Sequence, residues 1–190
     1  MMKKISLGSQ NCFYPSPTIL VGTAINGAPN YLNVTYAGIA NRSPAMLFIS
    51  LNKLHYSTSG IKELKTFSVN IPSVEILKET DYCGLVSGKD IDKSAIFHTF
   101  YDISGKIPMI EECAINIACE VVHEFELEGS NVLFIGKILE SFSEEKYLSN
   151  GSPDIMKTNP ILFSVNDSGY YSVGANIGKA LDIGKTMIPQ

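Results

Sequence analysis

The chain has 190 residues, 45% of them hydrophobic, which is typical of one globular domain with a sizeable core. A net charge of -4 and a single arginine, Arg42, argue against nucleic acid as a partner, because a phosphate backbone requires a basic face. No apolar run approaches the ~20 residues that cross a bilayer, and no Ser-, Gly- or Pro-rich linker divides the chain. We therefore expect a soluble protein, without membrane contact, that folds as one domain over residues 1–190.

The N-terminus and the cysteines both point to the cytoplasm. Two lysines at the N-terminus precede only a stub of apolar sequence, too little for a secretory signal. The four cysteines form no Cys-x-x-Cys pair, so we expect free thiols rather than disulfides or a zinc site. They are Cys12, Cys83, Cys113 and Cys119. The three histidines lack metal-ligand spacing, and no metal is expected.

The first elements in chain order read as antiparallel strands. Residues Thr18–Ile25 and Pro29–Tyr36 have strand character, and Asn26-Gly27 between them is a strong hairpin signal. The continuous apolar run Ala45–Leu51 is typical of a strand that is covered on both faces, in the middle of a sheet.

Helical spacing follows and then gives way to alternation. Ser57 and Thr58 precede apolar residues at helical intervals, so their hydroxyls suit a helix N-cap. In Phe67–Ile71, apolar residues alternate with Ser68 and Asn70, which predicts a strand with one face in the core. Pro72 ends this strand.

The segment Asp81–Lys93 is predicted to be a polar, glycine-punctuated loop. It gathers a thiol, a hydroxyl, glycines, aspartates and lysines. This density of functional groups exceeds what a simple connection needs, so the loop is a candidate for ligand binding. Within it, Asp92-Lys93 is typical of a structural ion pair or a helix start, and Cys83 is the one thiol expected to line a site.

The second half of the chain returns to strands. Short helical turns are expected near Val74–Leu77 and Lys93–Phe97. A long hairpin joins 115–121 to 132–139, and Ile161–Val165 is expected to pair with Tyr170–Val173 across a turn. About seven or eight strands with short inserted helices favour a closed, mainly antiparallel barrel over a doubly wound parallel sheet.

Five short segments occur together in one order along the chain. They are Pro29–Ala37 (PNYLNVTYA), Ile49–Lys53 (ISLNK) with His55 and Thr58 soon after, Phe67–Asn70 (FSVN), Cys83–Lys93 (CGLVSGKDIDK) and Gly178–Ala180 (GKA). No segment is specific alone, but their combination resembles the flavin reductase-like family of FMN-binding split barrels, and above all its flavoredoxin branch. The resemblance extends from about Pro15 to Gly184.

This resemblance implies a mainly β fold with short helices, a six-stranded antiparallel Greek-key split β-barrel. It also implies a homodimer with one FMN per subunit at the edge of the interface, and electron transfer through that flavin. Asn33, Val34, Thr35 and Tyr36 would lie beside the isoalloxazine, and Ser50, Leu51, Asn52 and Lys53 would border its pyrimidine edge and ribityl chain. His55, Ser57 and Thr58 would face the phosphate, while Cys83 and Ser87 through Lys93 would close the site or reach the partner's.

The residues make these placements chemically reasonable, although each has a simpler interpretation. The orphan N–H groups of a helix that starts after Ser57, with Lys53 nearby, would suit a phosphate dianion. The same hydroxyls are helix caps in any case, and Asn33 and Thr35 are also ordinary polar groups at a strand end.

The expected function is an FMN-dependent oxidoreductase, which passes electrons from NAD(P)H or a low-potential donor to flavin or to a redox protein partner. The cofactor carries the chemistry, so no catalytic acid or base is expected. Two alternatives stay open: an electron carrier without NAD(P)H turnover, and a non-catalytic flavin-binding protein. The pyridoxamine phosphate oxidases share the barrel, but their basic phosphate cluster has no counterpart here.

Overall fold

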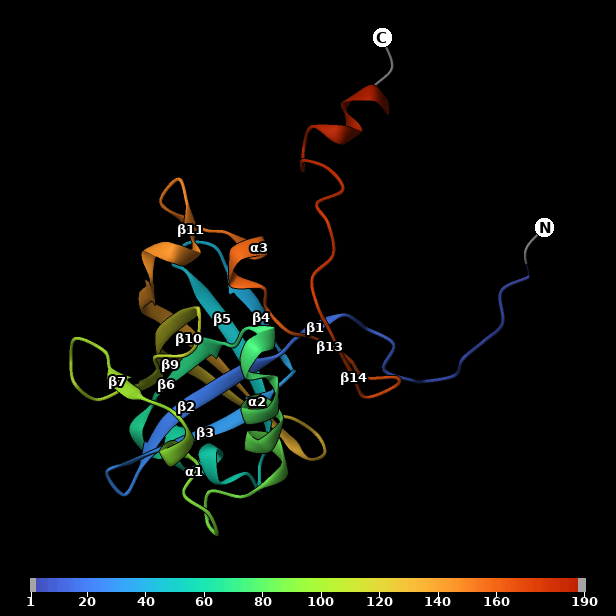
Figure 1. The fold of residues 1–190 in the computed structure, drawn as a ribbon. Coiled ribbons are helices and arrows are strands. Elements are labelled where there is room, and N and C mark those ends of the chain that lie inside the picture. The colour runs from blue at the N-terminus through green and yellow to red at the C-terminus, as the bar shows by residue number, and fades with distance from the viewer. Residues whose placement is uncertain (1–2, 188–190) are drawn as a thin grey trace.

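A seven-stranded antiparallel sheet forms the body of the protein, for which the computed structural model describes residues 3–187 (Figure 1). Its strand order is β3-β2-β6-β9-β10-β5-β4. The strands are β2 (Ile19–Ile25), β3 (Ala28–Val34), β4 (Ala37–Asn41), β5 (Met46–Asn52), β6 (Thr66–Ile71), β9 (Ile115–Glu126) and β10 (Asn131–Ser143). The expectation of a mainly β, antiparallel fold with short helices is confirmed.

Smaller elements surround this sheet. Strand β1 (Ser16–Pro17) pairs with β13 (Leu162–Ser164), which pairs with β14 (Gly169–Tyr171); β7 (Thr99–Tyr101) pairs with β8 (Pro108–Ile110), and β11 (Leu148–Ser149) with β12 (Ser152–Pro153). The α-helices are α1 (Tyr56–Leu64), α2 (Leu77–Leu85) and α3 (Ile155–Thr158), and 3₁₀ turns occupy Val74–Ile76, Ser94–Ile96, Glu145–Tyr147 and Ile183–Met187. Within residues 3–187, no helix has the length and apolar character needed to cross a membrane. Both terminal segments run away from the body (Figure 1).

The two edges of the large sheet are consecutive in the chain. Strand β3 ends at Val34, opposite Ile19, and β4 begins at Ala37, opposite Ile49, so the chain changes partner strand across Thr35 and Tyr36. The sequence pattern predicted one continuous strand to Tyr36 and a closed barrel. Instead the chain bends there, and the ladder of hydrogen bonds does not close.

The apolar run in β5 is covered on one face only. Its neighbours in the sheet are β10 and β4, so it does have a partner on each side. Leu47, Ile49 and Leu51 are buried, whereas Met46 and Phe48 are partly exposed. The expectation of cover on both faces is therefore wrong for the single chain, because the second face of β5 points out of the body.

The main core lies against the inner face of the sheet. Its largest fully buried side chains include Phe67, Phe134, Ile49, Leu51 and Ile61, which come from three strands and helix α1. Strand β10 can pass close to this cluster at Gly136, where a Cβ atom would lie 2.5 Å from the Phe67 ring. Helix α1 thus packs on the sheet by burying Ile61 in the same cluster.

The polar face of β6 is buried rather than exposed, contrary to the prediction of a half-buried strand. Asn70 Nδ2 donates to the Leu20 carbonyl (2.9 Å), and its Oδ1 accepts from Ile110 N (3.1 Å) and Asn116 Nδ2 (2.8 Å). Ser68 Oγ donates to the Pro108 carbonyl (2.5 Å). The β7–β8 hairpin covers this face and supplies hydrogen-bond partners for its polar side chains. Sequence patterns did not indicate this hairpin, and the alternation in β6 therefore predicted that these side chains face solvent.

Replacing Asn70 with alanine should strongly destabilise the protein. The change leaves the Ile110 N–H and the Asn116 amide without their buried acceptor, and we expect the free energy of unfolding to fall by about 3 kcal/mol. Urea denaturation of Asn70→Ala checks this. Ser141→Ala, on an exposed position of β10, is the control and should change stability by less than about 0.5 kcal/mol; equal effects of the two variants would contradict the network.

Candidate functional site

A cavity of ≈ 250 Å³, here called the bend cavity, opens where β3 passes into β4. Eight residues that the sequence analysis selected line it together: Asn33, Val34, Thr35, Tyr36, Ser50, Leu51, Asn52 and His55. The bend itself makes the opening, since Ser50 N donates to the Tyr36 carbonyl (2.9 Å) while the chain leaves the edge of β2.

Asn131 also lines the bend cavity, and the sequence analysis missed it. It begins β10, where it lies opposite Asn52 in the register, and its Nδ2 donates to Ser50 Oγ (3.1 Å). The pairing of β10 with β5, had it been inferred from the sequence, would have placed Asn131 here.

Asn33 is oriented by a short chain of hydrogen bonds. Its Nδ2 donates to Tyr170 Oη (3.0 Å), which in turn donates to Asp81 Oδ1 (2.8 Å). Burial, and then the hydrogen bond to the Asp81 carboxylate, raise the pKa of Tyr170 to about 12. The other amide atom, Asn33 Oδ1, is sealed from solvent and has no partner among the described residues. Asn33 Oδ1 is therefore a buried hydrogen-bond acceptor without a donor among the described residues.

The sequence analysis did not select Tyr170 as a site residue, because it comes from the β13–β14 hairpin, far from Asn33 in the chain. Only the folded structure brings strand β14 against helix α2 and the end of β3.

A second cavity of ≈ 270 Å³, here called the loop cavity, adjoins the bend cavity, and His55 lines both. Its walls come from β3, from the start of α1, and from the segment after α2. They are Asn30, Leu32, Leu54, His55, Tyr56, Ser57, Gly84, Leu85, Val86, Ser87, Gly88 and Lys93. The two cavities together form an elongated site.

Lys93 brings a buried positive charge to the loop cavity. The residue is 3% exposed, and its Nζ donates to the carbonyls of Cys83 (3.0 Å) and Val86 (3.1 Å). Within residues 3–187, no carboxylate lies at ion-pair distance from it. Removal from solvent lowers the pKa of Lys93.

Of the two interpretations of Asp92-Lys93, the helix start is confirmed, because a 3₁₀ turn begins at Ser94, and the ion pair does not form. The Asp92 carboxylate instead accepts from Ser94 N (2.9 Å) and Ser94 Oγ (2.7 Å), so it caps the following turn. Lys93 turns inward, and its charge stays without a counter-ion on the described part of the chain.

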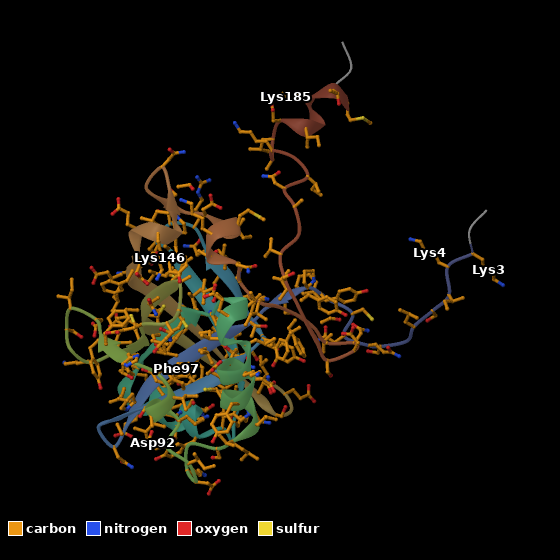
Figure 2. The ribbon with its side chains drawn as sticks, in the orientation of Figure 1. Lys3, Lys4, Asp92, Phe97, Lys146 and Lys185 are labelled. Carbon is orange, nitrogen blue, oxygen red and sulfur yellow. The ribbon has the colours of Figure 1, made fainter. Side chains whose placement is uncertain are left out.

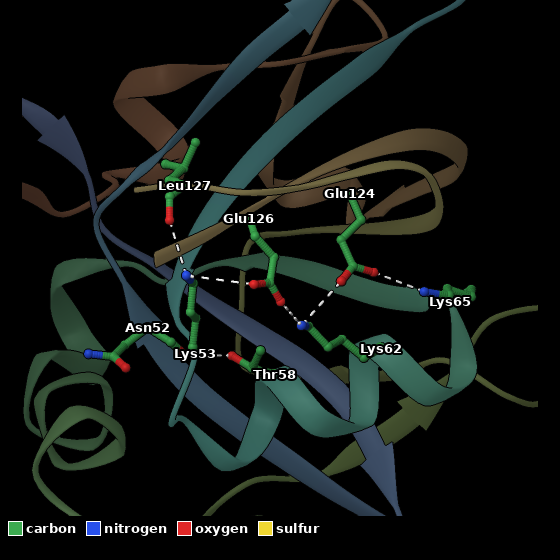
Figure 3. A network of polar contacts seen from close by, with 8 residues as sticks. All are labelled: Asn52, Lys53, Thr58, Lys62, Lys65, Glu124, Glu126 and Leu127. Atoms are coloured by element: carbon green, nitrogen blue, oxygen red, sulfur yellow. Dashed lines mark hydrogen bonds and ion pairs between the residues drawn. The ribbon is translucent and has the colours of Figure 1, made fainter. Parts of the chain in front are cut away.

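Helix α1 begins at Tyr56, two residues before the start expected after Ser57. Its N-cap is His55, in extended conformation and without a side-chain cap, so the hydroxyls are not the cap. Ser57 Oγ accepts from Asn30 Nδ2 (2.7 Å), and Thr58 Oγ1 donates to the Asn52 carbonyl (2.8 Å; Figure 3). The backbone N–H groups of Tyr56 and Ser57 find no acceptor among the described residues. They remain available at the loop cavity.

His55 stands at the junction of the two cavities. Partial burial, and then the positive charge of Lys93, lower the pKa of its imidazole. The neutral ring can therefore accept or donate a hydrogen bond at neutral pH without adding charge.

Three candidate residues line neither cavity: Lys53, Thr58 and Cys83. Lys53 Nζ donates to the Leu127 carbonyl (3.0 Å) and lies 3.7 Å from Glu126, so it points at the β9–β10 turn (Figure 3). Thr58 contacts the site only indirectly, because its hydroxyl donates to the carbonyl of Asn52, which lines the bend cavity.

Cys83 belongs to the core. Helix α2 runs to Leu85, so the first part of the predicted loop is helical, and Cys83 is fully buried within it. It packs in a cluster with Leu20, Tyr31 and Phe97, and burial raises the pKa of its thiol to about 11. A thiol in this state is a packing residue rather than a nucleophile.

The two cavities suit an elongated ligand with an anionic end. The bend cavity offers a buried acceptor and uncharged amides and hydroxyls, and the loop cavity offers a buried cation and free helix N–H groups. Among the described residues, no three His, Cys, Asp or Glu side chains are placed to hold a metal ion.

Comparisons with known proteins identify the family. Residues 11–156 match the model of the flavin reductase like domain. An uncharacterized protein of Archaeoglobus fulgidus is 32% identical over 144 residues, which is 75% of this chain and 80% of that protein.

Two solved structures are similar over almost the whole chain. A flavoredoxin from Methanosarcina acetivorans is 41% identical, with a TM-score of 0.95 over 98% of this chain and 100% of that one. The flavoredoxin of Desulfovibrio vulgaris (Miyazaki F) is 33% identical, with a TM-score of 0.90 over 96% and 100%. An FMN-binding protein from Thermus thermophilus, only 16% identical over 94% and 98%, shares the fold with a TM-score of 0.77. The chain therefore belongs to the flavin reductase like domain family.

Proposed function

We propose that this protein binds FMN across the bend and loop cavities and transfers electrons through it. The proposal rests on the buried charge of Lys93, which has no counter-ion among the described residues and lines a cavity beside two free helix N–H groups. A buried charge without a partner is unfavourable, so a bound phosphate dianion would relieve it. FMN has such a dianion at one end.

The bend cavity fits the other end of FMN. The oxidised isoalloxazine has one ring N–H, at N3, and Asn33 Oδ1 is a buried acceptor without a donor among the described residues. Asn52, Ser50 and Asn131 also line the cavity and add hydrogen-bonding groups, and Leu51 and Val34 add apolar contact. A pocket of this kind orients a planar ring and leaves one side for a partner.

The cation proposed for the phosphate differs from the one expected at first. Lys53 is engaged at the β9–β10 turn, whereas Lys93 has two of its three N–H donors on carbonyls and one left over. Lys93 and the start of α1 would therefore hold the phosphate, with His55 between phosphate and ring.

The flavin supplies the redox chemistry when bound, by accepting and releasing hydride or single electrons. The chain contributes binding and orientation: Asn33 is fixed by Tyr170, and the loop cavity anchors the charged tail. We propose NAD(P)H or a low-potential protein as donor, and free flavin or a redox protein as acceptor. Similarity to two flavoredoxins supports the second candidate, an electron carrier without nicotinamide turnover.

We also propose that two chains form a homodimer through the outer face of β4, β5 and β10. Phe48 and Ile135 lie directly opposite each other on this face, and Leu133 extends the same apolar surface, while all three side chains are partly exposed. Ser50 follows Phe48 by two residues on β5 and therefore points to the same face. The bend cavity, which Ser50 lines, opens at this face. A second copy packed here would lie beside the flavin and would cover the exposed side of β5.

Light scattering tests the dimer. The wild-type mass should be about twice the 20.7 kDa of one chain, and Ile135→Asp, which would bury a carboxylate in the interface, should shift it toward the monomer. Ile103→Asp, at an exposed position in the β7–β8 turn away from this face, is the control and should stay dimeric. A monomeric wild-type protein would contradict the proposal.

Replacing Lys93 with methionine should weaken the binding of FMN but not of riboflavin. The variant removes one charge-assisted hydrogen bond to the phosphate, which corresponds to about 10- to 100-fold in Kd. Fluorescence titration with both flavins measures this, since riboflavin lacks the phosphate. Lys89→Met removes an exposed lysine from the same loop and should leave both affinities unchanged.

A parallel loss of FMN and riboflavin binding in Lys93→Met would show that Lys93 only supports the fold of the loop. If the wild-type protein does not bind FMN, the proposal that it transfers electrons through FMN is contradicted.

Anaerobic reduction separates the two functions. If the protein is a reductase, NADH or NADPH should bleach the bound flavin and sustain turnover when free FMN is added. If it is a carrier, both nicotinamides should fail while a low-potential protein donor reduces the flavin. A flavin that resists every donor would contradict both functions and favour a non-catalytic flavin-binding protein.

A further inference from the structure

A further, larger cavity lies away from the proposed flavin site. It measures ≈ 710 Å³ and shares no lining residue with the bend or loop cavities. The walls are formed by the 3₁₀ turn Val74–Ile76, the β7–β8 hairpin, the segment before β9 with the start of β9, and the end of β10 with the turn after it. In Figure 2 its rim residue Lys146 and the loop residue Asp92, next to Lys93, lie toward opposite ends of the body.

Carboxylates dominate the charge of this cavity, here called the acidic cavity. Glu112 pairs with His98 (2.7 Å) and Glu144 pairs with Lys146 (2.8 Å). Glu75 and Glu111 also line the cavity, and neither has a cation at ion-pair distance among residues 3–187. Two negative charges are thus left without a partner in that part of the chain.

A buried amide adds an acceptor on the floor of the acidic cavity. Asn116 is 4% exposed, and its Nδ2 donates inward to Asn70 Oδ1 (2.8 Å) and to the Ile110 carbonyl (2.7 Å). Its Oδ1 accepts no hydrogen bond from the described residues. The described residues have two polar side-chain atoms that are sealed from solvent and lack a partner, Thr18 Oγ1 and Asn33 Oδ1. Asn116 Oδ1 lacks a partner but is not one of them, so it is accessible. Because Asn116 lines the acidic cavity, this oxygen is accessible from the cavity. Such an atom accepts from a donor that enters from outside.

Aromatic rings form the apolar part of the wall. Phe100 and Phe142 pack edge to face, with ring centroids 5.8 Å apart and an interplanar angle of 89°. At the rim, Lys146 Nζ lies 4.8 Å from the centre of the Tyr147 ring while it pairs with Glu144. The cavity already holds one cation of its own by combining a carboxylate with a ring face.

We propose that the acidic cavity binds an organic cation, an ammonium or guanidinium group carried on an apolar body. The unpaired carboxylates and the Asn116 oxygen would accept its N–H donors, and the rings would contact its carbon skeleton. A bare metal ion is a poorer match, because no three ligating side chains gather here within the described residues and much of the wall is apolar. The cation is either a free amine or a lysine or arginine side chain of a partner protein.

Calorimetric titration of the full-length protein with 2-phenylethylammonium tests the site, with and without added FMN. The neutral isostere 2-phenylethanol should bind at least about 10-fold more weakly, the scale of one charge-assisted hydrogen bond. Glu75→Gln with Glu111→Gln should weaken amine binding by a similar factor. Glu63→Gln with Glu128→Gln removes the same charge from exposed positions outside the cavity and should have no effect.

The source of the cation is tested with Nα-acetyl-lysine-methylamide and Nα-acetyl-arginine-methylamide, which keep the charged side chains of a partner protein. Tighter binding of either peptide than of the amine would indicate a partner protein, and the reverse would indicate a free amine. Equal binding of amine and alcohol, equal losses in the two double variants, or no saturable binding of any cation would overturn the proposal.

Discussion

The chain bends at Thr35 and Tyr36 because strand β3 pairs with β2 while strand β4 pairs with β5, so that these two residues join opposite edges of one sheet. Backbone groups at such a change of partner cannot all stay in a ladder, and the chain opens a cavity there instead. The fold and the site therefore have the same origin, and residues of β3, β5 and β10 meet around the opening.

The second determinant is electrostatic. An acidic chain holds one lysine inside the body, without a carboxylate among the described residues, at the place where a helix leaves its first N–H groups free. The carbonyls of Cys83 and Val86 solvate the ammonium but do not neutralise it. If FMN binds as proposed, this uncompensated charge would explain how a protein of net charge -4 holds a phosphate dianion.

Sequence patterns predicted most strands of the large sheet, because these depend on local order along the chain, whereas most of the cavity residues followed from the resemblance to the flavin reductase-like family. The Asn26-Gly27 hairpin and the alternation in β9 and β10 needed no tertiary information. The errors arose where distant segments decide the outcome: the β7–β8 hairpin buries Asn70, Tyr170 arrives from the far end of the chain, and helix α2 carries Cys83 into the core. The choice between Lys53 and Lys93 also depended on where each side chain turns, which composition and spacing do not reveal.

If FMN lies across the bend and loop cavities, its phosphate should be held at Lys93. A crystal structure of the protein grown with FMN is the decisive test. We expect electron density for the phosphate within hydrogen-bonding distance of Lys93 Nζ and the first N–H groups of α1, with the ring edge at Asn33 Oδ1. FMN bound elsewhere on the chain, or a phosphate that points away from Lys93, would contradict this binding mode.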